Sequence, residues 1–354
     1  MKPSPHIVVI RLSAMGDVAM TVPVLLKLTK TYPEVRITVI SRELFRPIFK
    51  DISNVSFIEA DVKGKHKGLL GIVKLAKEVK RQKITAVADL HNVIRSNVMT
   101  RYFKSFAIKV AKIDKGRAEK KALTKPNEKL FKPLKSTHER YADVFRKLGY
   151  ALDLKHPLFL DKKSLRLPFT IDAFKKQIGM APFAAYESKR YPLELMKEVL
   201  QELDKKGNYQ LFLFGSQAER EDLEQLGKGL KSVTTVAGIS FEEELALISN
   251  LAVMVSMDSA NGHLAAMYGV PVITLWGVTH PFAGFAPFNQ PMENQILSNM
   301  EKYPLIPTSI YGNKFPQGYE KVMESIKPVI VVEKILSVLA TTPLSPPNQG
   351  GETN

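Results

Sequence analysis

Apolar positions in the first 150 residues follow two alternating spacings. Short runs rich in β-branched residues are typical of buried strands, and between them apolar residues recur every three or four positions, as in amphipathic helices. The strand-like runs are His6–Leu12, Arg36–Ser41, Val55–Glu59 and Ala86–Leu90, and the helix-like stretches are Val18–Thr31, Leu44–Lys50, Leu69–Gln82 and Thr137–Leu148. This alternation predicts a doubly wound parallel sheet covered by helices.

A second series of the same kind follows Pro168. Its predicted strands are Phe183–Tyr186, Tyr209–Phe214, Ala252–Ser256 and Val270–Trp276, and its predicted helices are Pro192–Lys206, Ser240–Leu251, one beginning near Ser259, and Pro328–Leu339. Ser240 and Glu243 have the spacing of a capping box. We therefore expect an α/β protein with two Rossmann-like doubly wound domains.

The predicted domain boundaries follow from these two series. Residues 1–168 would form a strongly basic N-terminal domain that binds the acceptor, and residues 169–326 a C-terminal domain that binds a nucleotide-sugar. A terminal helix over 327–340 would pack back on the N-terminal domain. The tail 341–354 contains three prolines and a glycine pair and is expected to be disordered.

Composition excludes several classes of protein. The chain has no cysteine, and no window approaches the roughly 20 apolar residues that a spanning helix needs. The absence of cysteine favours a reducing, cytoplasmic compartment. No Asp-x-Asp pair occurs, no group of histidines or carboxylates has the spacing of a metal site, and the dinucleotide fingerprint is missing. We expect neither a bound metal nor a cofactor.

Charge is distributed unevenly along the chain. Residues 1–170 hold 36 Lys and Arg against 15 Asp and Glu, whereas residues 171–354 hold 15 against 20. The basic half would attract an anionic glycolipid, an anionic membrane face or a nucleic acid. A non-catalytic nucleic-acid-binding protein is the more remote alternative, because the basic region lacks the interleaved aromatic residues that stack on bases.

Polar residues that could take part in catalysis or ligand binding follow the predicted strands. Arg11, Ser13, Gly16 and Asp17 come after the first strand, at the edge where open α/β sheets bind ligands. Asp17 is a candidate general base, although a helix cap explains an aspartate there equally simply. Asp258, Ser259, Ala260 and His263 lie where a strand leads into a helix, whose free N–H groups favour an anion. A capped helix with a buried histidine is the alternative.

Two further positions fit the same picture. Lys189 and Arg190 precede a helix, where a cation opposes the helix dipole unless an anion binds there. Glu219 lies just beyond the strand Tyr209–Phe214, where its carboxylate could accept hydrogen bonds from a ribose. By itself an exposed glutamate is a weak signal.

Several of these motifs resemble glycosyltransferase family 9, the ADP-heptose:lipopolysaccharide heptosyltransferase family. The matching segments are R-L-S-A-M-G-D at 11–17, S-K-R-Y-P at 188–192, and D-S-A-N-G-H-L-A-A with the following G-V-P-V-I-T-L-W-G at 258–277. The resemblance runs from about residue 6 to about residue 340. It implies a GT-B fold, with two Rossmann-like domains facing across a cleft, and inverting transfer of heptose from ADP-heptose to a lipopolysaccharide inner core.

The resemblance also implies a role for individual residues. Asp17 would be the general base, Lys189 would contact the diphosphate as a second catalytic residue, Glu219 would lie near the ribose and Ile239 near the adenine. Asp258, Ser259, Ala260 and His263 would form the donor-binding helix start. Arg11, Ser13, Gly16, Arg95, Lys120 and Lys121 are candidates for acceptor binding, and the basic half would hold the enzyme at the anionic inner leaflet.

The chain departs from the family pattern at two places. Ala184-Ala185 replaces a loop that often carries a hydroxyl residue, and Ser259-Ala260 replaces the usual Thr-Gly. Both pairs lie in the expected donor site, so a different nucleotide-sugar or acceptor is the alternative function.

Overall fold

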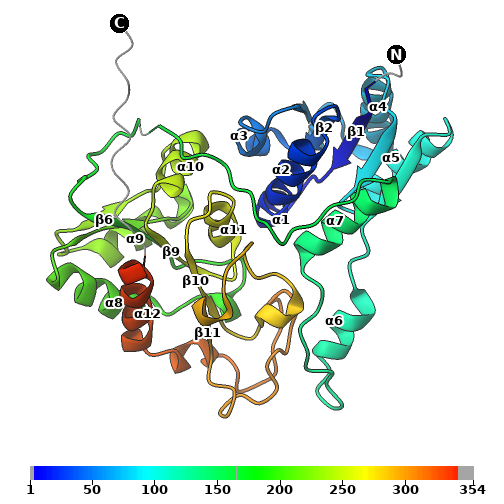
Figure 1. Ribbon diagram of the computed structural model, residues 1–354. Coiled ribbons are helices and arrows are strands. Elements are labelled where there is room, and N and C mark those ends of the chain that lie inside the picture. The colour runs from blue at the N-terminus through cyan, green and yellow to red at the C-terminus, as the bar shows by residue number, and fades with distance from the viewer. Residues whose placement is uncertain (1–3, 165, 342–354) are drawn as a thin grey trace, which may run out of the picture. The chain divides into compact units, whose positions relative to one another are not determined.

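The computed structural model describes residues 4–164 and 166–341. These residues form two compact units. The first comprises the described residues up to Gly116 together with Lys135–Leu160, and the second comprises Arg117–Leu134 and the described residues from Asp161 onward. Figure 1 labels their elements. Each unit is described by itself.

The first unit is built on a parallel five-stranded sheet in the order β3-β2-β1-β4-β5. Its strands are β1 (His6–Ile10), β2 (Arg36–Ser41), β3 (Val55–Glu59), β4 (Ala86–Asp89) and β5 (Lys109–Lys112). The register pairs Ile7 with Ile37 on one side and with Ala86 on the other. Its helices are α1 (Met15–Ala19), α2 (Val22–Thr31), α3 (Arg46–Phe49), α4 (Gly68–Lys80), α5 (Ile94–Lys104) and α7 (Thr137–Leu148), with a 3₁₀ turn at Glu43–Phe45.

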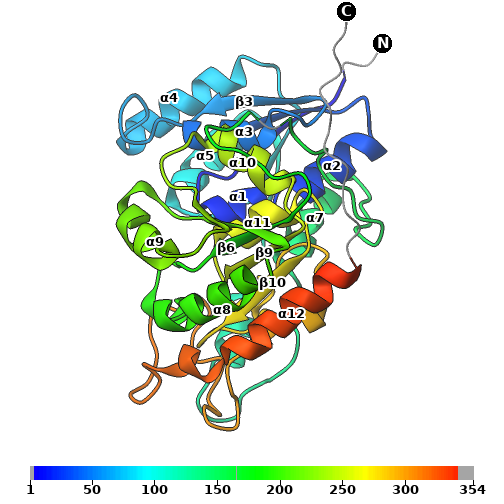
Figure 2. The same ribbon diagram turned by 90° about the vertical axis from the view of Figure 1, so that its left-hand side faces the viewer.

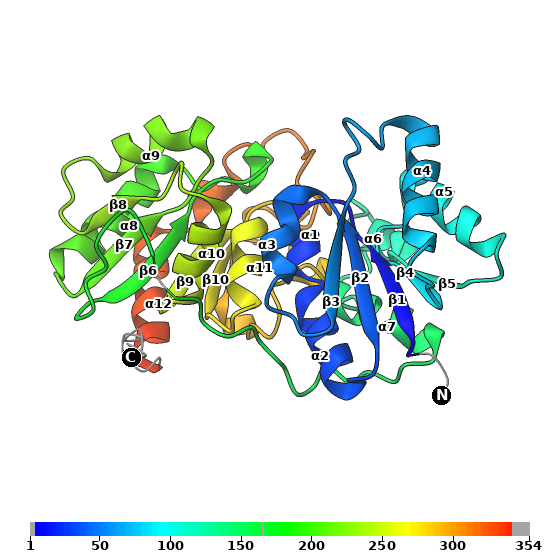
Figure 3. The same ribbon diagram turned by 90° about the horizontal axis from the view of Figure 1, so that it is seen from above.

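Burial explains why these residues form these elements. All five residues of β1 are buried, as expected for a central parallel strand covered on both faces. Ile72, Leu75 and Val79 lie on one side of α4 and join Met99 and Phe103 of α5 in a core cluster over the sheet. These two helices lie side by side (Figure 3).

The second unit contains a parallel six-stranded sheet in the order β11-β10-β9-β6-β7-β8. Its strands are β6 (Lys176–Ala181), β7 (Tyr209–Leu213), β8 (Val233–Thr235), β9 (Val253–Met257), β10 (Val272–Trp276) and β11 (Gln295–Leu297). Its helices are α6 (Arg117–Leu123), α8 (Leu193–Lys205), α9 (Arg220–Gly227), α10 (Phe241–Ser249), α11 (Ala260–Ala266) and α12 (Pro328–Thr341). Short 3₁₀ turns occur at Glu187–Lys189, Gln217–Glu219, Pro281–Ala283, Met292–Asn294 and Val322–Ser325.

Three predicted elements differ from the structure. The helix expected over Leu44–Lys50 is a 3₁₀ turn followed by the short helix α3. The helix expected over Val18–Thr31 is split into α1 and α2. The strand expected at Phe183–Tyr186 is a loop, and the real strand, β6, lies before it. β6 begins with polar Lys176 and contains Gly179, whose missing side chain leaves room for Leu251 and Met254 to pack against the backbone. Because side chains from neighbouring segments fill the space beside β6, the strand itself has only a weak hydrophobic pattern.

The grouping of segments also differs from the predicted boundaries. Residues 117–134 were expected in the N-terminal domain, but they group with the second unit. There Lys129 Nζ donates to the carbonyl oxygens of Leu305 and Pro307, and the Leu134 N–H donates to Phe282 O at 2.9 Å. The hydrophobic contacts and hydrogen bonds of this segment, rather than its position in the sequence, decide where it packs.

The terminal helix packs within the second unit. We expected it on the N-terminal domain, but α12 lies beside α8 (Figure 2), and Lys176 Nζ donates to Leu339 O at 2.6 Å. The helix reaches Thr341, and the rest of the predicted disordered tail lies outside the described residues. None of the described helices is both long and apolar enough to span a bilayer.

Candidate functional site

Each sheet has a point at which the chain reverses its direction of winding. In the first sheet the chain runs from β1 outward to β3 and then crosses to β4, on the other side of β1. In the second it runs from β6 outward to β8 and then crosses to β9, on the other side of β6. Loops leave the two adjacent strands in opposite directions at such a switch point, which makes it the usual ligand site of an open α/β sheet.

Asp17 lies at the switch point of the first unit. It is the third residue of α1, directly beyond β1, and its side chain is 28% exposed. Its Oδ2 atom lies 2.6 Å from Arg11 Nη2 and 3.4 Å from the backbone nitrogen of Ala14, which donates to it. No described residue donates to the other oxygen, Oδ1. The carboxylate therefore caps the helix through one oxygen and leaves the other free to accept a proton.

Arg11 holds this carboxylate in place. Its guanidinium is buried, donates from Nη1 to Leu90 O at 2.7 Å and lies 5.8 Å from the centre of the Tyr141 ring. Tyr141 in turn donates its hydroxyl to Asp17 O at 3.2 Å, and burial raises the pKa of that hydroxyl. The described contacts of its guanidinium are with Leu90, Tyr141 and Asp17, and the expectation that Arg11 binds the acceptor stays a prediction.

His91 follows β4 on the other side of the switch point. It is buried, and its Nδ1 accepts from the Leu12 N–H at 3.4 Å. Burial, followed by the charges of Arg11 and Lys115, lowers the pKa of His91 to about 3. The ring is therefore neutral at physiological pH and serves as a hydrogen-bond acceptor for the loop that carries Asp17.

Lys189 and Asp258 meet at the switch point of the second unit. Lys189 lies in the 3₁₀ turn after β6, and Asp258 directly follows β9. Lys189 Nζ donates to Asp258 O at 2.6 Å and lies 3.3 Å from Asp258 Oδ2. An ammonium group has three hydrogens, so this pair still leaves one donor for a ligand. The structure thus brings together two of the residues predicted for the donor site.

The helix start beside this pair is capped from an unexpected residue. Ser259 is the N-cap of α11, but its side chain makes no capping hydrogen bond. Instead, Ser256 Oγ accepts the Gly262 N–H at 3.1 Å and lies 3.1 Å from Ser259 Oγ. The Ser259 hydroxyl is therefore not committed to the helix, while Ala260 is half-buried and His263 is buried.

A loop that the sequence analysis did not single out holds Lys189 in position. Ser188 Oγ donates to Gly312 O at 2.5 Å, and Gly312 has a φ of +80°. A Cβ at Gly312 would lie 2.7 Å from Lys189 Cγ, so only glycine admits the lysine stem. Gly277 likewise admits the Ser188 carbonyl, which would lie 2.2 Å from an added Cβ. In the sequence, only the turn-forming residues Ser309–Asn313 could have indicated this loop.

The other donor candidates follow neighbouring strands of the same sheet. Glu219 comes after β7, and its Oε2 accepts from the Ser216 N–H and hydroxyl, each at 2.8 Å. Ile239 comes after β8 and is half-buried. Ala184 is buried, and its carbonyl accepts from Arg190 Nε at 2.9 Å, whereas Ala185 is exposed. Strands β9, β6, β7 and β8 are consecutive in the sheet, so these residues share one edge.

The acceptor candidates differ in accessibility. Ser13 and Gly16 are half-buried beside Asp17, and Arg95 is exposed at the start of α5. Lys121 is exposed on α6. Lys120 is buried, and its ammonium lies 4.0 Å from the centre of the Phe285 ring. It is therefore less accessible than its predicted role requires.

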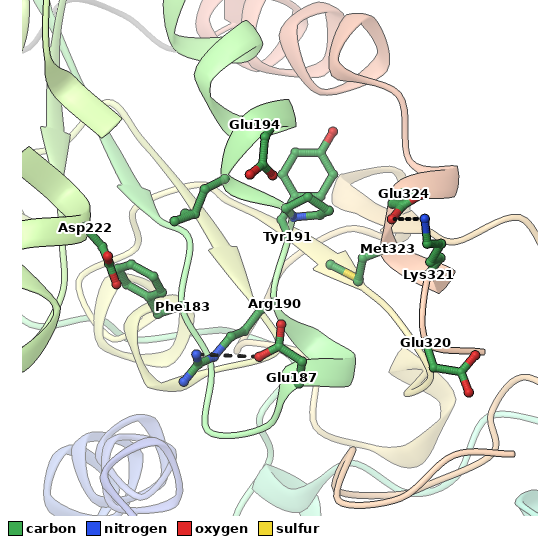
Figure 4. Close-up of a pocket in the computed structure, with 12 residues that line it drawn as sticks. Phe183, Glu187, Arg190, Tyr191, Glu194, Asp222, Glu320, Lys321, Met323 and Glu324 are labelled. Atoms are coloured by element: carbon green, nitrogen blue, oxygen red, sulfur yellow. Dashed lines mark ion pairs between the residues drawn. The ribbon is translucent and has the colours of Figure 1, made fainter. Parts of the chain in front are cut away.

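We call the 3₁₀ turn Glu187–Lys189 the lysine turn. A pocket of about 370 Å³, lined in part by Glu187 and Arg190, lies beside it (Figure 4). Carboxylates dominate its lining: Glu187, Glu194, Asp222, Glu320 and Glu324 outnumber Arg190 and Lys321. Two of these carboxylates are paired, Glu187 with Arg190 at 3.6 Å and Glu324 with Lys321 at 3.7 Å. The remaining negative charge disfavours a diphosphate, so the pocket is not a donor site. Within the described part of the chain, no group of three or more His, Cys, Asp or Glu side chains could hold a metal.

Comparison with known proteins identifies relatives of the chain. The family model of glycosyltransferase family 9 (heptosyltransferase) matches residues 72–308. The lipopolysaccharide core heptosyltransferase OpsX of Haemophilus influenzae is 26% identical over 300 residues, which are 79% of this chain and 81% of the relative. Lipopolysaccharide heptosyltransferase 1 of Pseudomonas aeruginosa is 23% identical over 298 residues, which are 78% and 79% of the two chains.

Solved structures share the fold. A glycosyl transferase family 9 protein from Veillonella parvula superimposes with a TM-score of 0.74 at 19% identity, covering 96% of this chain and 98% of that one. The Escherichia coli heptosyltransferase WaaC, solved with ADP, gives 0.66 at 18% identity, covering 94% and 99%. The predicted fold class, GT-B with two Rossmann-like domains, is confirmed.

Proposed function

This chain belongs to glycosyltransferase family 9, and we propose that it transfers a heptose from an ADP-sugar to an inner-core acceptor of lipopolysaccharide. The names of its relatives support this choice of donor and acceptor. The observation that carries the proposal is the contact between Lys189 and Asp258 beside the start of α11. A cation and a helix start at a switch point are what a nucleoside diphosphate needs for binding.

The proposed reaction is a single displacement that inverts the anomeric carbon. Asp17 Oδ1 takes the proton of an acceptor hydroxyl while the hydroxyl oxygen bonds to that carbon. The bond between the carbon and the diphosphate oxygen breaks, and ADP leaves with the electron pair. Lys189 and the N–H groups at the start of α11 stabilise the negative charge that develops on the leaving group. No metal takes part.

The remaining assignments complete the proposal. Glu219 would bind the ribose and Ile239 the adenine, with Ala184, Ala185, Ser259, Ala260 and His263 lining the donor site. Ser13, Gly16, Arg95 and Lys121 would contact the acceptor, while Arg11 would position Asp17. A donor with another sugar is the alternative, because Ala184-Ala185 and Ser259-Ala260 depart from the family pattern at the donor site.

Calorimetry with ADP tests the donor site. Lys189→Ala should weaken ADP binding by about ten- to over a hundredfold, since a charge-assisted contact contributes roughly 1.5–3 kcal/mol. Lys206→Ala removes an exposed lysine from the same unit and should leave the affinity unchanged. All measurements are made in EDTA, and binding or turnover that returned only on adding Mg²⁺ would contradict the proposal.

Asp258 provides a further control, because removing Lys189 also leaves its carboxylate unpaired. If Lys189 acted only by neutralising Asp258, the double variant Lys189→Ala/Asp258→Asn would regain wild-type ADP affinity. We expect the double variant to stay weak, because the phosphate contact itself is lost. Unchanged affinity in Lys189→Ala would move the donor site elsewhere.

A further inference from the structure

Residues 117–134, which we call the α6 segment, pack on two loops of the second unit. Both ends of the segment continue into the first unit, yet its side chains contact the loops 277–285 and 305–313. Lys120 and Lys121 of this segment were expected to bind the acceptor. The two loops that it contacts indicate a different use for the segment.

Both loops hold the lysine turn. Gly277, in the first loop, lies so close to Ser188 that an added Cβ would be 2.2 Å from the Ser188 carbonyl oxygen. Gly312, in the second loop, accepts the Ser188 hydroxyl through its carbonyl oxygen and lies against the stem of Lys189. The two loops are also joined, because the Thr308 N–H of the second donates to a carbonyl oxygen of the first at 3.0 Å. A displacement of either loop would therefore move the Lys189 ammonium.

An ammonium of the α6 segment anchors the second loop. Lys129 Nζ donates to Leu305 O and, at 3.2 Å, to Pro307 O. These carbonyls come just before Ser309, whose Oγ accepts the Gly312 N–H at 3.0 Å. Hydrogen bonds from a charged donor are stronger than neutral ones, and they are strengthened further here because Lys129 is half-buried. Lys129 therefore fixes the start of the loop that holds the lysine turn.

Aromatic and cationic side chains of the α6 segment anchor the first loop. The centre of the Phe131 ring lies 5.1 Å from that of His280 and 5.0 Å from that of Phe282. Lys120 is buried, and its ammonium lies 4.0 Å from the centre of the Phe285 ring, within the range of a cation–π contact. The α6 segment thus contacts each of the two loops that hold the lysine turn.

We propose that the α6 segment positions the lysine turn, and with it Lys189, for binding of the donor. Lys129 is the main positioning residue. It acts through the loop 305–313, which sets the direction of the Lys189 ammonium. The inference rests on the proposed function, because it takes Lys189 as the cation that contacts the diphosphate. It gives part of the basic half of the chain a use in donor binding, where the sequence had indicated acceptor binding.

Calorimetry with ADP in EDTA tests the positioning. Lys129→Met should weaken ADP binding by about three- to tenfold, less than loss of the whole Lys189 contact, because that lysine is displaced and not removed. Lys129→Arg keeps the cation and should bind ADP within about twofold of the wild type. In a chain that already carries Lys189→Ala, Lys129→Met should have no further effect. If Lys189→Ala is weakened, full affinity in Lys129→Met, or an equal effect of Lys129→Met in both backgrounds, would overturn the proposal.

Lys197→Met is the matched control, because Lys197 also donates its ammonium to two carbonyl oxygens of the second unit. Its acceptors, Leu226 O at 2.7 Å and Lys228 O at 2.6 Å, belong to neither loop. Both methionine variants lose one cation and one pair of hydrogen bonds, so both melting temperatures should fall. Only Lys129→Met should weaken ADP binding. An equal loss of affinity in Lys197→Met would mean that lost charge or lost stability, rather than positioning, controls the affinity.

Hydrogen exchange of the ADP-free chain separates this inference from the proposed function. The backbone N–H groups of Lys189 and Gly312 are both hydrogen-bonded, so their exchange reports how firmly the turn and the loop are held. Exchange there should become faster in Lys129→Met but not in Lys197→Met. If it does, while Lys189→Ala keeps full ADP affinity, the proposed donor site fails and the effect of the α6 segment on the lysine turn stands. If Lys189→Ala weakens ADP binding but Lys129→Met changes neither measurement, the positioning fails alone.

Phe131→Leu provides a second test at an exposed position. Its ring is 44% exposed, so the variant should fold. The substitution removes the ring contacts with His280 and Phe282, and it should weaken ADP binding and speed exchange in the same direction as Lys129→Met. If Lys129→Met failed to fold, unchanged ADP affinity together with unchanged exchange in Phe131→Leu would overturn the proposal.

Discussion

At the scale of single residues, Asp17 has a structural contact at a helix start, and we propose a chemical role for it as well. One carboxylate oxygen contacts Arg11 and the Ala14 N–H at the start of α1, and the other is left open. The helix-cap interpretation and the general-base interpretation were alternatives in the sequence. The structure shows the contact at the helix start, which uses Oδ2; the general base, for which we propose Oδ1, stays a prediction.

Asp17→Asn distinguishes the base from the cap. Asparagine caps a helix about as well as aspartate and can still accept from Arg11, so the fold and ADP affinity should be kept. Turnover should fall by about 10²–10⁴-fold, the usual contribution of a positioned base. Melting temperature, calorimetry and steady-state kinetics on the same preparation provide the comparison. A folded variant with near-normal turnover would remove Asp17 from the mechanism.

At the scale of elements, the lysine turn depends on a loop more than a hundred residues away. Ser188 donates to Gly312 O, and the Gly312 backbone lies against the stem of Lys189. The loop is itself braced, because Ser309 Oγ accepts the Gly312 N–H at 3.0 Å. The direction of the Lys189 ammonium is therefore set by two elements together.

Gly312→Ala should disturb this arrangement. The added Cβ would lie 2.7 Å from Lys189 Cγ at a residue whose φ is +80°. We expect ADP affinity to fall by about tenfold, the effect of losing roughly one charge-assisted hydrogen bond. Gly318→Ala is the matched control: its φ is +86°, but nothing lies within 4 Å of an added Cβ.

The two alanine variants separate backbone strain from the contact with lysine. Both should lose about 1 kcal/mol or more of unfolding free energy, because alanine is strained at positive φ. Only Gly312→Ala should also weaken ADP binding. Equal losses of affinity in the two variants would mean that general strain, rather than the position of Lys189, controls the donor site.

At the scale of the whole molecule, each unit buries a histidine in its neutral form. The pKa of His91 is lowered to about 3, mainly by burial, and burial together with Lys129 lowers the pKa of His280 to about 4. His280 is buried against Phe131 and Phe282 in the second unit. Both rings can take up a proton more readily when the chain is unfolded.

This difference predicts acid sensitivity with a definite sign. Below the ordinary histidine pKa of 6.5, the unfolded chain binds more protons than the native one, so stability falls as pH decreases from 7 to 5. Each buried histidine should account for up to about 2 kcal/mol over that range. Urea unfolding at both pH values measures it. His91→Gln and His280→Gln should flatten the dependence, and His156→Gln, at an exposed position, should not.

The charge distribution also has a different meaning in the folded molecule. Residues 117–134 carry six Lys and Arg against two Asp and Glu, and they belong to the second unit. Part of the basic half therefore lies on the unit proposed to bind the donor. Counting charges along the sequence could not assign this segment to a unit, because its place in the fold is decided by packing and not by its position in the chain.

Local pattern was sufficient wherever an element carries its own hydrophobic periodicity. β2 and β3 were predicted with their observed ends, as was α7, which ends at Gly149 with a φ of +105°. The capping box at Ser240 is also confirmed. β5, β6, β8 and β11 were missed, because their residues are partly polar and are held as strands by their neighbours.

The sequence by itself determined the two αβ series, the family and the residues that follow each strand, because these depend on local spacing and short motifs. Only the tertiary structure decided the partners of those residues: Arg11 with Asp17, Lys189 with Asp258, and Gly312 against the lysine stem. Winding of each sheet brings strands β1 and β4, and β6 and β9, next to each other. Contacts between residues so far apart in the chain arise from packing, which no local pattern encodes.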